Sequence, residues 1–190
     1  MSPRFLIEFL RDPSGIGAIA PSSSRLAKAI TAEIGIEAAR VVVEYGPGTG
    51  AFTKAILKRL APGAVFFAIE QNPHMAAALR QRFPSVTVFE DSVANLGRLL
   101  QESGIEAVDC IVSGLPWASF SSRLQDELLG QTLAALRPGG RFATFAYLQG
   151  LLMPAGRRFR RKLHACFSRV ERSPVVWCNL PPAFVYRCTR

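Results

Sequence analysis

A glycine-rich segment in the first third of the chain has the residue types of a cofactor-binding loop. The apolar, β-branched run 41–43 leads into Glu44, and glycine then occupies every second position at Gly46, Gly48 and Gly50. Glycine lets a backbone turn sharply and lets a ligand approach without interference from a Cβ atom. Ligands of open parallel sheets bind at the carboxyl ends of the strands. We therefore expect this loop to hold a nucleoside-like cofactor.

Two cofactor classes fit the glycine spacing, and neighbouring residues distinguish them. The three glycines and Ala51 also satisfy the loose dinucleotide pattern G-x-G-x-x-G/A. Glu44, however, suits a cationic, amine-bearing ligand and would repel a pyrophosphate. Pro47 removes a backbone N–H that a pyrophosphate would use. Both features favour S-adenosylmethionine, which carries no phosphate, over NAD.

Acidic residues at two further strand ends extend the predicted cofactor site. The apolar run 64–69 ends in Glu70, 20 residues after Gly50, a spacing at which a carboxylate can bind both ribose hydroxyls; a solvated strand-end charge is the alternative. Asp91 follows the run 86–89 and is a candidate acceptor for an adenine amino group, with helix capping by Asp91 or Ser92 as the alternative. The residues expected to bind the cofactor are Glu44, Tyr45, Gly46, Gly48, Gly50, Glu70, Gln71, Asp91, Ser92 and Ser113.

Basic residues are concentrated in the block 157–162, and the chain as a whole carries a formal charge of +9. Such a block indicates an anionic partner, either nucleic acid or a membrane surface. A solvated helix face is the alternative. The residues expected to contact a membrane here are Arg157, Arg158, Arg160 and Arg161.

Length and composition limit the class of protein. The 190 residues are 49% hydrophobic, which predicts one folded domain, 1–190. No apolar run reaches the ~18 residues needed to span a bilayer, and no secretory signal is evident near the amino terminus. The four cysteines are widely spaced and fit neither a metal site nor a disulfide framework. We therefore expect no metal and a reducing cytoplasm.

Strands and helices alternate along the chain, which predicts an α/β fold with a doubly wound, mostly parallel sheet and helices on both faces. An amino-terminal helical cap, 1–34, with a possible membrane contact, precedes a Rossmann-like core, 35–190. The expected helices are 5–10, 22–34, 51–60, 73–82, 93–102, 121–136 and 154–167. The expected strands are 41–46, 64–70, 86–90, 107–112 and 141–147. The end of the chain reads as a hairpin of strands 175–178 and 184–188, so one late strand should be antiparallel.

Taken together, these motifs resemble class I S-adenosylmethionine-dependent methyltransferases. The resemblance covers residues 41–190 and includes the E-x-G-x-G-x-G loop, the acidic end of the second strand, and the segment 136–140 before the fifth strand. It implies seven strands with an antiparallel strand near the carboxyl terminus. The finer pattern in 17–23, 113–117 and 179–187 is similar to bacterial phospholipid N-methyltransferases.

The finer resemblance implies stepwise N-methylation of phosphatidylethanolamine to phosphatidylcholine. The enzyme would be monomeric and cytoplasmic, attached peripherally to the inner face of the cytoplasmic membrane. Further residues expected at the lipid are Ser22, Ser23, Tyr147, Tyr186 and Arg187. No general base stands out, since His74 and His164 read as surface or packing residues.

The segment 113–117 is predicted to position the acceptor amine beside the transferred methyl group. Methyl transfer from a sulfonium to an amine is an in-line displacement, so alignment and exclusion of water are the main requirements. Trp117 would offer an aromatic face to a methylated ammonium, with core packing as the alternative. The residues expected to be catalytic are Ser113, Gly114, Leu115, Pro116 and Trp117.

Two other functions remain open. An RNA adenine N6-methyltransferase is the first, because Ser113–Trp117 resembles a motif that stacks a target base and a basic chain binds RNA; nucleic acid is nevertheless the less favoured partner. A non-catalytic membrane-surface module with a vestigial cofactor fold is the second. It predicts vesicle binding without affinity for S-adenosylmethionine.

Overall fold

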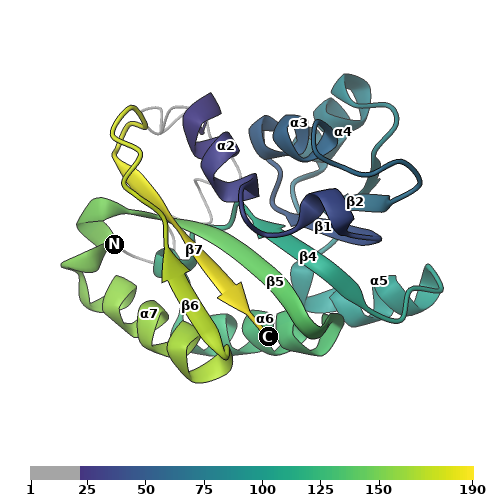
Figure 1. Cartoon of the computed structure of the whole chain (residues 1–190). Helices are drawn as coiled ribbons and strands as arrows, with labels where there is room; N and C mark the ends of the chain where they lie inside the picture. Colours follow the sequence, from purple (N-terminus) through teal and green to yellow (C-terminus); the bar gives the residue numbers. More distant parts are fainter. Residues whose placement is uncertain (1–21) are drawn as a thin grey trace.

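A seven-stranded sheet forms the centre of the computed structural model, which describes residues 22–190 (Figure 1). The strand order is β3-β2-β1-β4-β5-β7-β6. Strands β1 to β5 are parallel, and β7 pairs antiparallel with both β5 and β6. The predicted Rossmann-like sheet with one antiparallel strand near the carboxyl terminus is thereby confirmed.

The element bounds follow the predicted alternation closely. The strands are β1 Val41–Tyr45, β2 Val65–Ile69, β3 Thr87–Phe89, β4 Val108–Ser113, β5 Leu136–Tyr147, β6 Arg169–Arg172 and β7 Ala183–Thr189. The α-helices are α2 Ser24–Thr31, α3 Ala51–Leu57, α4 Pro73–Arg82, α5 Leu96–Glu102, α6 Ser122–Ala135 and α7 Pro154–Cys166. Short 3₁₀ turns are η1 Ile36–Ala38, η2 Val93–Asn95, η3 Trp117–Ser119 and η4 Leu148–Leu151.

Two apolar layers bury the sheet from both sides. Helices α2, α3 and α4 cover one face, and α5, α6 and α7 cover the other (Figure 1). Alternate residues of β1 enter opposite layers: Val42 packs toward α3, whereas Val43 and Tyr45 pack toward α6. A strand covered on both faces needs a continuous apolar run, which 41–43 supplies.

Capping side chains set the starts of α2, α4 and α6. The Ser23 hydroxyl accepts from Leu26 N at the start of α2, and the Asn72 side chain accepts from the first turn of α4. Ser121 caps α6 in the same way. These caps satisfy backbone donors that have no partner within the helix.

Two predicted strand assignments were wrong. Strand β5 begins at Leu136, five residues before the predicted start at 141, so Pro138–Gly140 lies inside the strand rather than separating it from α6. The register of β5 against β4 shifts there, and Gly139 has φ +72°, which glycine tolerates. The final hairpin uses 169–172, not 175–178, because only Val176 bridges to Ala183 in the later segment. The predicted helix 5–10 lies outside the described residues.

The predicted helix 22–34 is shorter than expected, since α2 ends at Thr31. Its Leu26 and Ile30 are fully buried in the layer shared with α3 and β7. Helix α2 therefore packs as part of the hydrophobic core and not as a separate cap.

Candidate active site

Strand register places the predicted loops at one level along the carboxyl edge of the sheet. Tyr45, the last residue of β1, pairs with Ile69 of β2 on one side and with Ser113 of β4 on the other. The glycine loop, Glu70 and the segment 113–117 therefore leave the sheet next to one another. Strand order also reverses between β1 and β4, and such switch points are where open α/β sheets bind ligands.

The glycine loop adopts a backbone conformation that other residues rarely accept. Gly46, Gly48 and Gly50 have φ values of +60°, +52° and +79°. A Cβ at Gly50 would meet the Phe83 ring at 2.5 Å, whereas at Gly48 the nearest atom would be Met75 Cε at 3.9 Å. Gly50 is therefore a packing glycine, while Gly48 faces open space at which a ligand can approach the backbone.

The glycine loop and the β4 loop are packed backbone against backbone. Gly114 N donates to the Tyr45 carbonyl at 2.8 Å, and a Cβ at Gly114 would lie 2.5 Å from the Gly46 carbonyl oxygen. A Cβ at Gly46 would in turn meet Leu115 Cδ2 at 2.7 Å. This contact fixes the predicted donor-binding loop directly beside the predicted acceptor-positioning segment.

Glu70 connects the ends of β1 and β2. Its Oε2 accepts from Gly48 N at 3.2 Å and its Oε1 from Asn72 N at 3.0 Å, and the residue is only 7% exposed. The side chain is thus a held carboxylate and not a solvated strand-end charge. Each oxygen keeps a second acceptor position, so the group remains able to bind hydroxyl donors at this edge.

Glu44 lies beneath the glycine loop rather than at its entrance. It is fully buried on the α3 side, where its Oε2 accepts from the Thr53 hydroxyl at 2.7 Å. Its Oε1 has no hydrogen-bond partner among the described residues. Burial raises the pKa of Glu44 from 4.5 to about 8, although the bond from Thr53 acts in the opposite direction. A buried, incompletely paired carboxyl under the loop suits a cationic ligand group nearby.

Thr53 was not identified from the sequence as part of this site. The feature that could have identified Thr53 is its position. It is a polar residue on the buried face of α3, at the third position of a helix that begins directly after the glycine loop. Met75, which faces Gly48 from α4, also had no signal distinct from that of an ordinary helix residue.

Asp91 and Ser92 at the end of β3 are engaged with the following helix. Ser92 Oγ accepts from Ala94 N at 3.2 Å and caps the turn η2. Asp91 accepts from Asn95 Nδ2 at 2.7 Å and forms an ion pair with Arg98. The hydrogen bond from Asn95 is the main cause of a lowered Asp91 pKa. The capping alternative therefore describes Ser92, and an adenine contact by Asp91 stays a prediction.

Trp117 belongs to the core, which corrects the expectation of an aromatic face open to substrate. Its ring is 1% exposed and stacks on Phe159 of α7 with centroids 5.1 Å apart. Its Nε1 donates to Ser113 Oγ at 2.9 Å, and its carbonyl accepts from Gln125. The predicted cation–π role needs a free ring face, and Trp117 does not offer one.

Two backbone carbonyls of the segment 113–117 also have hydrogen-bond partners within the protein. The Leu115 carbonyl accepts from Trp117 N at 3.0 Å and so is not free to accept from a substrate amine in that direction. The Pro116 carbonyl accepts from Ser119 N at 2.8 Å. Gly114, Leu115 and Pro116 themselves are half-buried at the carboxyl edge, so the corner they form can still contact an acceptor.

Several residues assigned to the lipid have structural partners instead. Tyr186 is buried among Phe159 and Phe184. Arg187 pairs with Glu33 at 2.6 Å and donates to the Ala29 carbonyl, which joins β7 to α2. Neither side chain is placed to meet a lipid phosphate, because packing and ion pairing already engage them.

The other side chains that the sequence predicted at the cofactor or the lipid differ in their exposure to solvent. Tyr45 is buried toward α6, with its hydroxyl 3.4 Å from Thr132 Oγ1, and burial raises its pKa. Ser23 caps α2, and Ser22 is half-buried beside it. Gln71 is exposed after Glu70. Tyr147 ends β5 half-buried, and desolvation raises its pKa.

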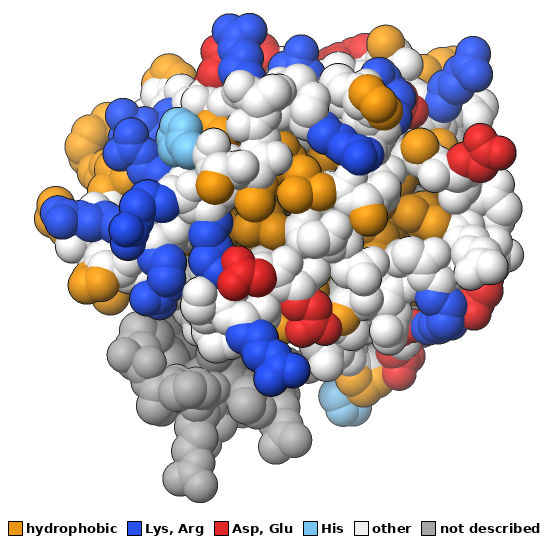
Figure 2. Space-filling model, turned by 90° about the horizontal axis from the view of Figure 1, so that it is seen from below, with side chains coloured by type: hydrophobic (Ala, Val, Ile, Leu, Met, Phe, Trp, Pro, Cys, Tyr) orange, Lys and Arg blue, Asp and Glu red, His pale blue; other side chains and the backbone are white. Residues whose placement is uncertain are grey.

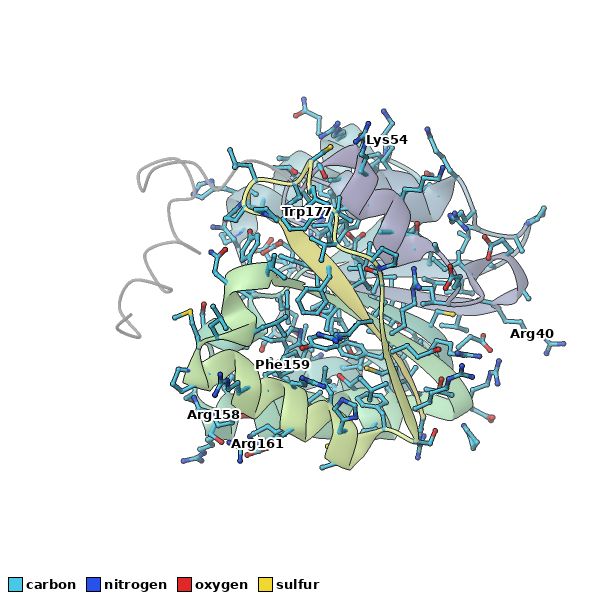
Figure 3. All side chains as sticks on the ribbon, turned by 60° about the vertical axis from the view of Figure 1, so that its left-hand side comes forward. Arg40, Lys54, Arg158, Phe159, Arg161 and Trp177 are labelled. Atoms are coloured by element: carbon cyan, nitrogen blue, oxygen red, sulfur yellow. The ribbon has the colours of Figure 1, made fainter. Side chains whose placement is uncertain are left out.

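The basic helix α7 has two distinct faces. Phe159 points toward the sheet, whereas Arg158 and Arg161 point away from it (Figure 3). Arg157, Arg160 and Arg161 are exposed, and Lys162 instead binds the Ser122 carbonyl and Asp126 of α6. Lys and Arg side chains gather on the side of the molecule where α7 lies (Figure 2).

Other features of the described residues lie apart from this site. His74 and His164 are both exposed. A shallow hollow of about 500 Å³ lies between α5 and α6, lined by residues such as Gly104 and Gln131, at the opposite edge of the sheet. Residues 22–190 contain no group of three His, Cys, Asp or Glu side chains arranged for a metal, and no helix among them is long and apolar enough to cross a membrane.

The residues at the carboxyl edge fit S-adenosylmethionine. The open backbone at Gly48, the held carboxylate of Glu70 and the buried carboxyl of Glu44 correspond to a ligand with a nucleoside diol and a cationic amine. None of them offers the free backbone donors or positive charge that a pyrophosphate requires.

Solved structures that are similar in fold include methyltransferases. An O-methyltransferase from Bacillus cereus in complex with S-adenosylhomocysteine is 16% identical with a TM-score of 0.71, covering 99% of this chain and 90% of that one. The magnesium protoporphyrin IX methyltransferase from Synechocystis PCC 6803, with bound S-adenosylmethionine, has the same TM-score at 9% identity, over 100% and 98% of the two chains. These likenesses establish the fold.

Proteins that are similar in sequence are also methyltransferases. An ornithine lipid N-methyltransferase from Singulisphaera acidiphila is 36% identical over 97% of this chain and 93% of its own length. The ribosomal RNA small subunit methyltransferase H of Acinetobacter baumannii is 34% identical over 40% of this chain but only 25% of its own length.

The sequence pattern of the family described as "Methyltransferase domain" matches residues 42–140. That match runs from β1 through the glycine loop and the β4 loop into β5, and so includes the cofactor edge described above. The chain therefore belongs to the methyltransferase domain family and is a class I S-adenosylmethionine-dependent methyltransferase.

Proposed function

We propose that this enzyme methylates the amine of a membrane aminolipid. The supporting observation is its 36% identity, over nearly the whole of both chains, to an ornithine lipid N-methyltransferase. The matched methyltransferase domain covers only residues 42–140, so the similarity to this relative also includes segments outside that domain. Those segments include the carboxyl-terminal half of β5, α7 and β7.

Two substrates share the required chemistry. Ornithine lipid and phosphatidylethanolamine both present a primary alkyl amine on a headgroup attached to acyl chains. The relative favours ornithine lipid, and the motifs at 17–23, 113–117 and 179–187 favour phosphatidylethanolamine, converted stepwise toward phosphatidylcholine. Either substrate implies an enzyme on the inner face of the cytoplasmic membrane.

The bound cofactor supplies an electrophilic methyl group on a sulfonium. The amine must arrive neutral and attack the methyl carbon in line. The C–N bond forms as the C–S bond breaks, the sulfur keeps the electrons of the broken bond, and the resulting ammonium then releases a proton to water. The glycine loop would hold the donor, Glu70 its ribose, and Glu44 the charge beneath the loop. Gly114–Pro116 would position the amine, since Gly114 is packed on Gly46.

The RNA alternative loses its main support. It depended on Trp117 as a stacking platform for a base, and that ring is covered by Phe159. The similarity to a ribosomal RNA methyltransferase covers only a quarter of that enzyme. We therefore do not assign RNA as the substrate.

Labelled S-adenosylmethionine tests the proposal directly. The enzyme is incubated with vesicles that contain ornithine lipid, phosphatidylethanolamine or neither, and the extracted lipids are separated. We expect label in one of the two aminolipids and none in vesicles of phosphatidylcholine alone. Glu70→Ala should reduce the labelling, because it removes the carboxylate that holds the loop.

Label in ribosomal RNA under the same conditions, with none in either aminolipid, would overturn the assignment. Chromatography of the labelled product against mono-, di- and trimethylated standards gives the number of methyl groups added.

A further inference from the structure

Large apolar side chains exposed to solvent are concentrated at one edge of the described structure. Among residues 22–190, the large apolar side chains that stand well into solvent are Val65, Leu152, Met153, Trp177 and Leu180. Four of these five flank the β5–β7 ladder, and Val65 begins β2 at the opposite edge. Single exposed apolar residues need no explanation, but this grouping does.

Topology brings the four residues to the cofactor edge. Tyr147, the last residue of β5, pairs with Ala183, the first residue of the antiparallel β7. The segments 148–153 and 174–182 therefore leave the sheet at the same end, where Leu148 N donates to the Pro182 carbonyl at 2.9 Å. Because β4 and β5 are parallel, this is also the end at which the segment 113–117 begins. We call Leu152, Met153, Trp177 and Leu180 the apolar rim.

Hydrogen bonds to buried groups fix the loop 174–182, which carries Trp177 and Leu180. Asn179 is buried, accepts from Ser23 N at 3.0 Å and donates to the Pro181 carbonyl at 2.8 Å. Val176 N bonds the Ala183 carbonyl at 2.7 Å. On either side of Asn179, Trp177 is 69% and Leu180 76% exposed. The loop thus turns its polar side chain inward and its apolar side chains outward, opposite to an ordinary solvated loop.

An arginine accompanies each rim segment. Arg25, exposed on the first turn of α2, contacts Cys178 Sγ at 2.5 Å through its guanidinium. Arg157, exposed at the start of α7, donates to the Leu151 carbonyl at 3.2 Å. Apolar tips including a tryptophan, flanked by arginines on a chain of charge +9, match the headgroup boundary of an anionic bilayer in both polarity and charge.

We propose that the apolar rim inserts into the headgroup boundary of an anionic lipid bilayer. The cofactor edge would then face the membrane, so that a lipid amine reaches the glycine loop without its acyl chains leaving the bilayer. This orientation rests on the proposed function, because an aminolipid substrate is what requires the edge to face lipid. The insertion itself can be measured without any methyl transfer.

Tryptophan fluorescence is the sharpest test, since the chain has two tryptophans and only Trp177 of the pair is exposed. The enzyme is mixed with vesicles of phosphatidylcholine and phosphatidylglycerol, with or without brominated acyl chains. We expect a blue shift with plain vesicles and quenching with brominated ones. Trp177→Phe keeps an apolar ring and should still bind while losing the quenching. Unshifted, unquenched emission in the presence of bound vesicles would overturn the proposal.

Vesicle sedimentation measures how much the rim contributes. Replacing both Trp177 and Leu180 by Ser should weaken binding by at least about tenfold, since two large side chains leave the interface. Val65→Ser removes an exposed apolar side chain at the opposite edge and should leave binding unchanged. Equal binding by the double variant and the parent enzyme would contradict insertion. Thermal melting confirms that each variant is folded.

Charge is tested with a second matched pair. Arg25→Gln with Arg157→Gln should weaken binding to anionic vesicles and have little effect on neutral ones. Arg40→Gln changes an exposed arginine just before β1, at the amino edge and far from Trp177 (Figure 3), and should have no effect. If Arg40→Gln lost about half as much as the double variant, which removes twice the charge, binding would follow total charge and not this edge.

The outcomes separate this proposal from the proposed function. Quenching of Trp177 without methylation of any lipid would reject the assigned activity alone. Methylation of a lipid in detergent micelles, together with unquenched Trp177 on vesicles, would reject the rim alone. Self-association that the Trp177/Leu180 double variant abolishes would show that the rim is a contact between copies of this chain, which also overturns insertion.

Discussion

At the scale of single residues, the site depends on backbone positions that admit no side chain. Gly114 and Gly46 lie in van der Waals contact across the switch point between β1 and β4. Each residue belongs to a different predicted role, one positioning the acceptor and the other holding the donor. Their contact sets the separation of the two loops, so methyl transfer should be sensitive to it.

Gly114→Ala tests this separation. The added Cβ would lie 2.5 Å from the Gly46 carbonyl oxygen, so the loops must move apart. We expect a loss of ~1–3 kcal/mol in the free energy of unfolding and at least about a tenfold fall in methyl transfer. Chemical denaturation and the vesicle assay measure the two effects.

Gly130→Ala is the matched control. Gly130 lies within α6, and a Cβ there would have nothing within 4 Å. Alanine should stabilise the helix by about 0.5–1 kcal/mol and leave activity unchanged. Equal behaviour of the two alanine variants would show that the Gly46–Gly114 contact is unimportant.

Glu44 makes folding stability depend on pH. Its pKa rises from 4.5 to about 8 on folding because the carboxyl is buried. The unfolded chain therefore loses this proton near pH 4.5 while the folded chain keeps it. The contribution of Glu44 to stability is full below pH 4.5, declines as pH rises, and is lost by about pH 8. Within this window, the free energy of unfolding should fall by up to ~1.4 kcal/mol for each pH unit.

Glu44→Gln should remove this dependence. The amide oxygen can still accept from Thr53, and no ionisation is left. Between pH 6 and pH 8, values within that window, the melting temperature of the ligand-free parent should fall more than that of Glu44→Gln. Glu106→Gln, at an exposed position, serves as control and should follow the parent. Parallel curves for all three proteins would contradict the assigned burial.

At the scale of elements, local patterns predicted most of the strands and helices. The run 41–43, the cap at Asn72 and the periodicity of 73–82 are local signals, and β1 and α4 appear where they indicated. The errors arose where tertiary pairing outweighs local chemistry. Pro138–Gly140 reads as a turn, yet it is accommodated as an irregularity in β5 by pairing with its neighbours. The sequence 175–178 is β-branched and aromatic, but β7 pairs with 169–172 instead.

The sequence predicted the backbone of the site but not the directions of all its side chains. Backbone requirements such as those at Gly46 and Gly48 can be read from residue type, because few other residues take a positive φ. The direction of a side chain cannot be read in this way. Trp117 and Tyr186 have the chemistry to meet a substrate, but their partner Phe159 comes from a helix about 30 to 40 residues away in sequence.

Helix α7 illustrates why a charged helix can still be part of the core. Phe159 contacts both Trp117 and Tyr186 and is buried. Phe159→Ala should cost ~3–5 kcal/mol in the free energy of unfolding, through lost burial and the remaining cavity. Denaturant titration measures it. Arg161→Ala changes the outward face of the same helix and should cost less than about 0.5 kcal/mol. Similar costs for both variants would contradict the two-faced helix.

At the scale of the whole molecule, the two edges of the sheet differ in character. The carboxyl edge holds the glycine loop, Glu70 and the apolar rim, whereas the amino edge has ion pairs such as Arg137–Asp109. The proposed insertion of the apolar rim would therefore put the cofactor and the membrane on the same side of the enzyme. In that orientation only the edge that binds the cofactor must reach the bilayer, and none of the helices in residues 22–190 has to cross it.

Cofactor binding should stabilise the whole domain, since the glycine loop joins three strands of the sheet. A ligand that binds only the folded state at a hundred times its Kd adds ~2.7 kcal/mol to the free energy of unfolding. For a domain of this size, that corresponds to a rise of roughly 5–10 °C in Tm. S-adenosylmethionine and S-adenosylhomocysteine should each produce it in a thermal melt, and NAD should not, because Pro47 has no backbone N–H and Gly48 N already donates to Glu70, which leaves the loop without the donors that a pyrophosphate needs. Glu70→Ala should reduce the rise for both ligands. A comparable rise with NAD, or none with either adenosyl ligand, would contradict the assignment of this edge as a sulfonium site.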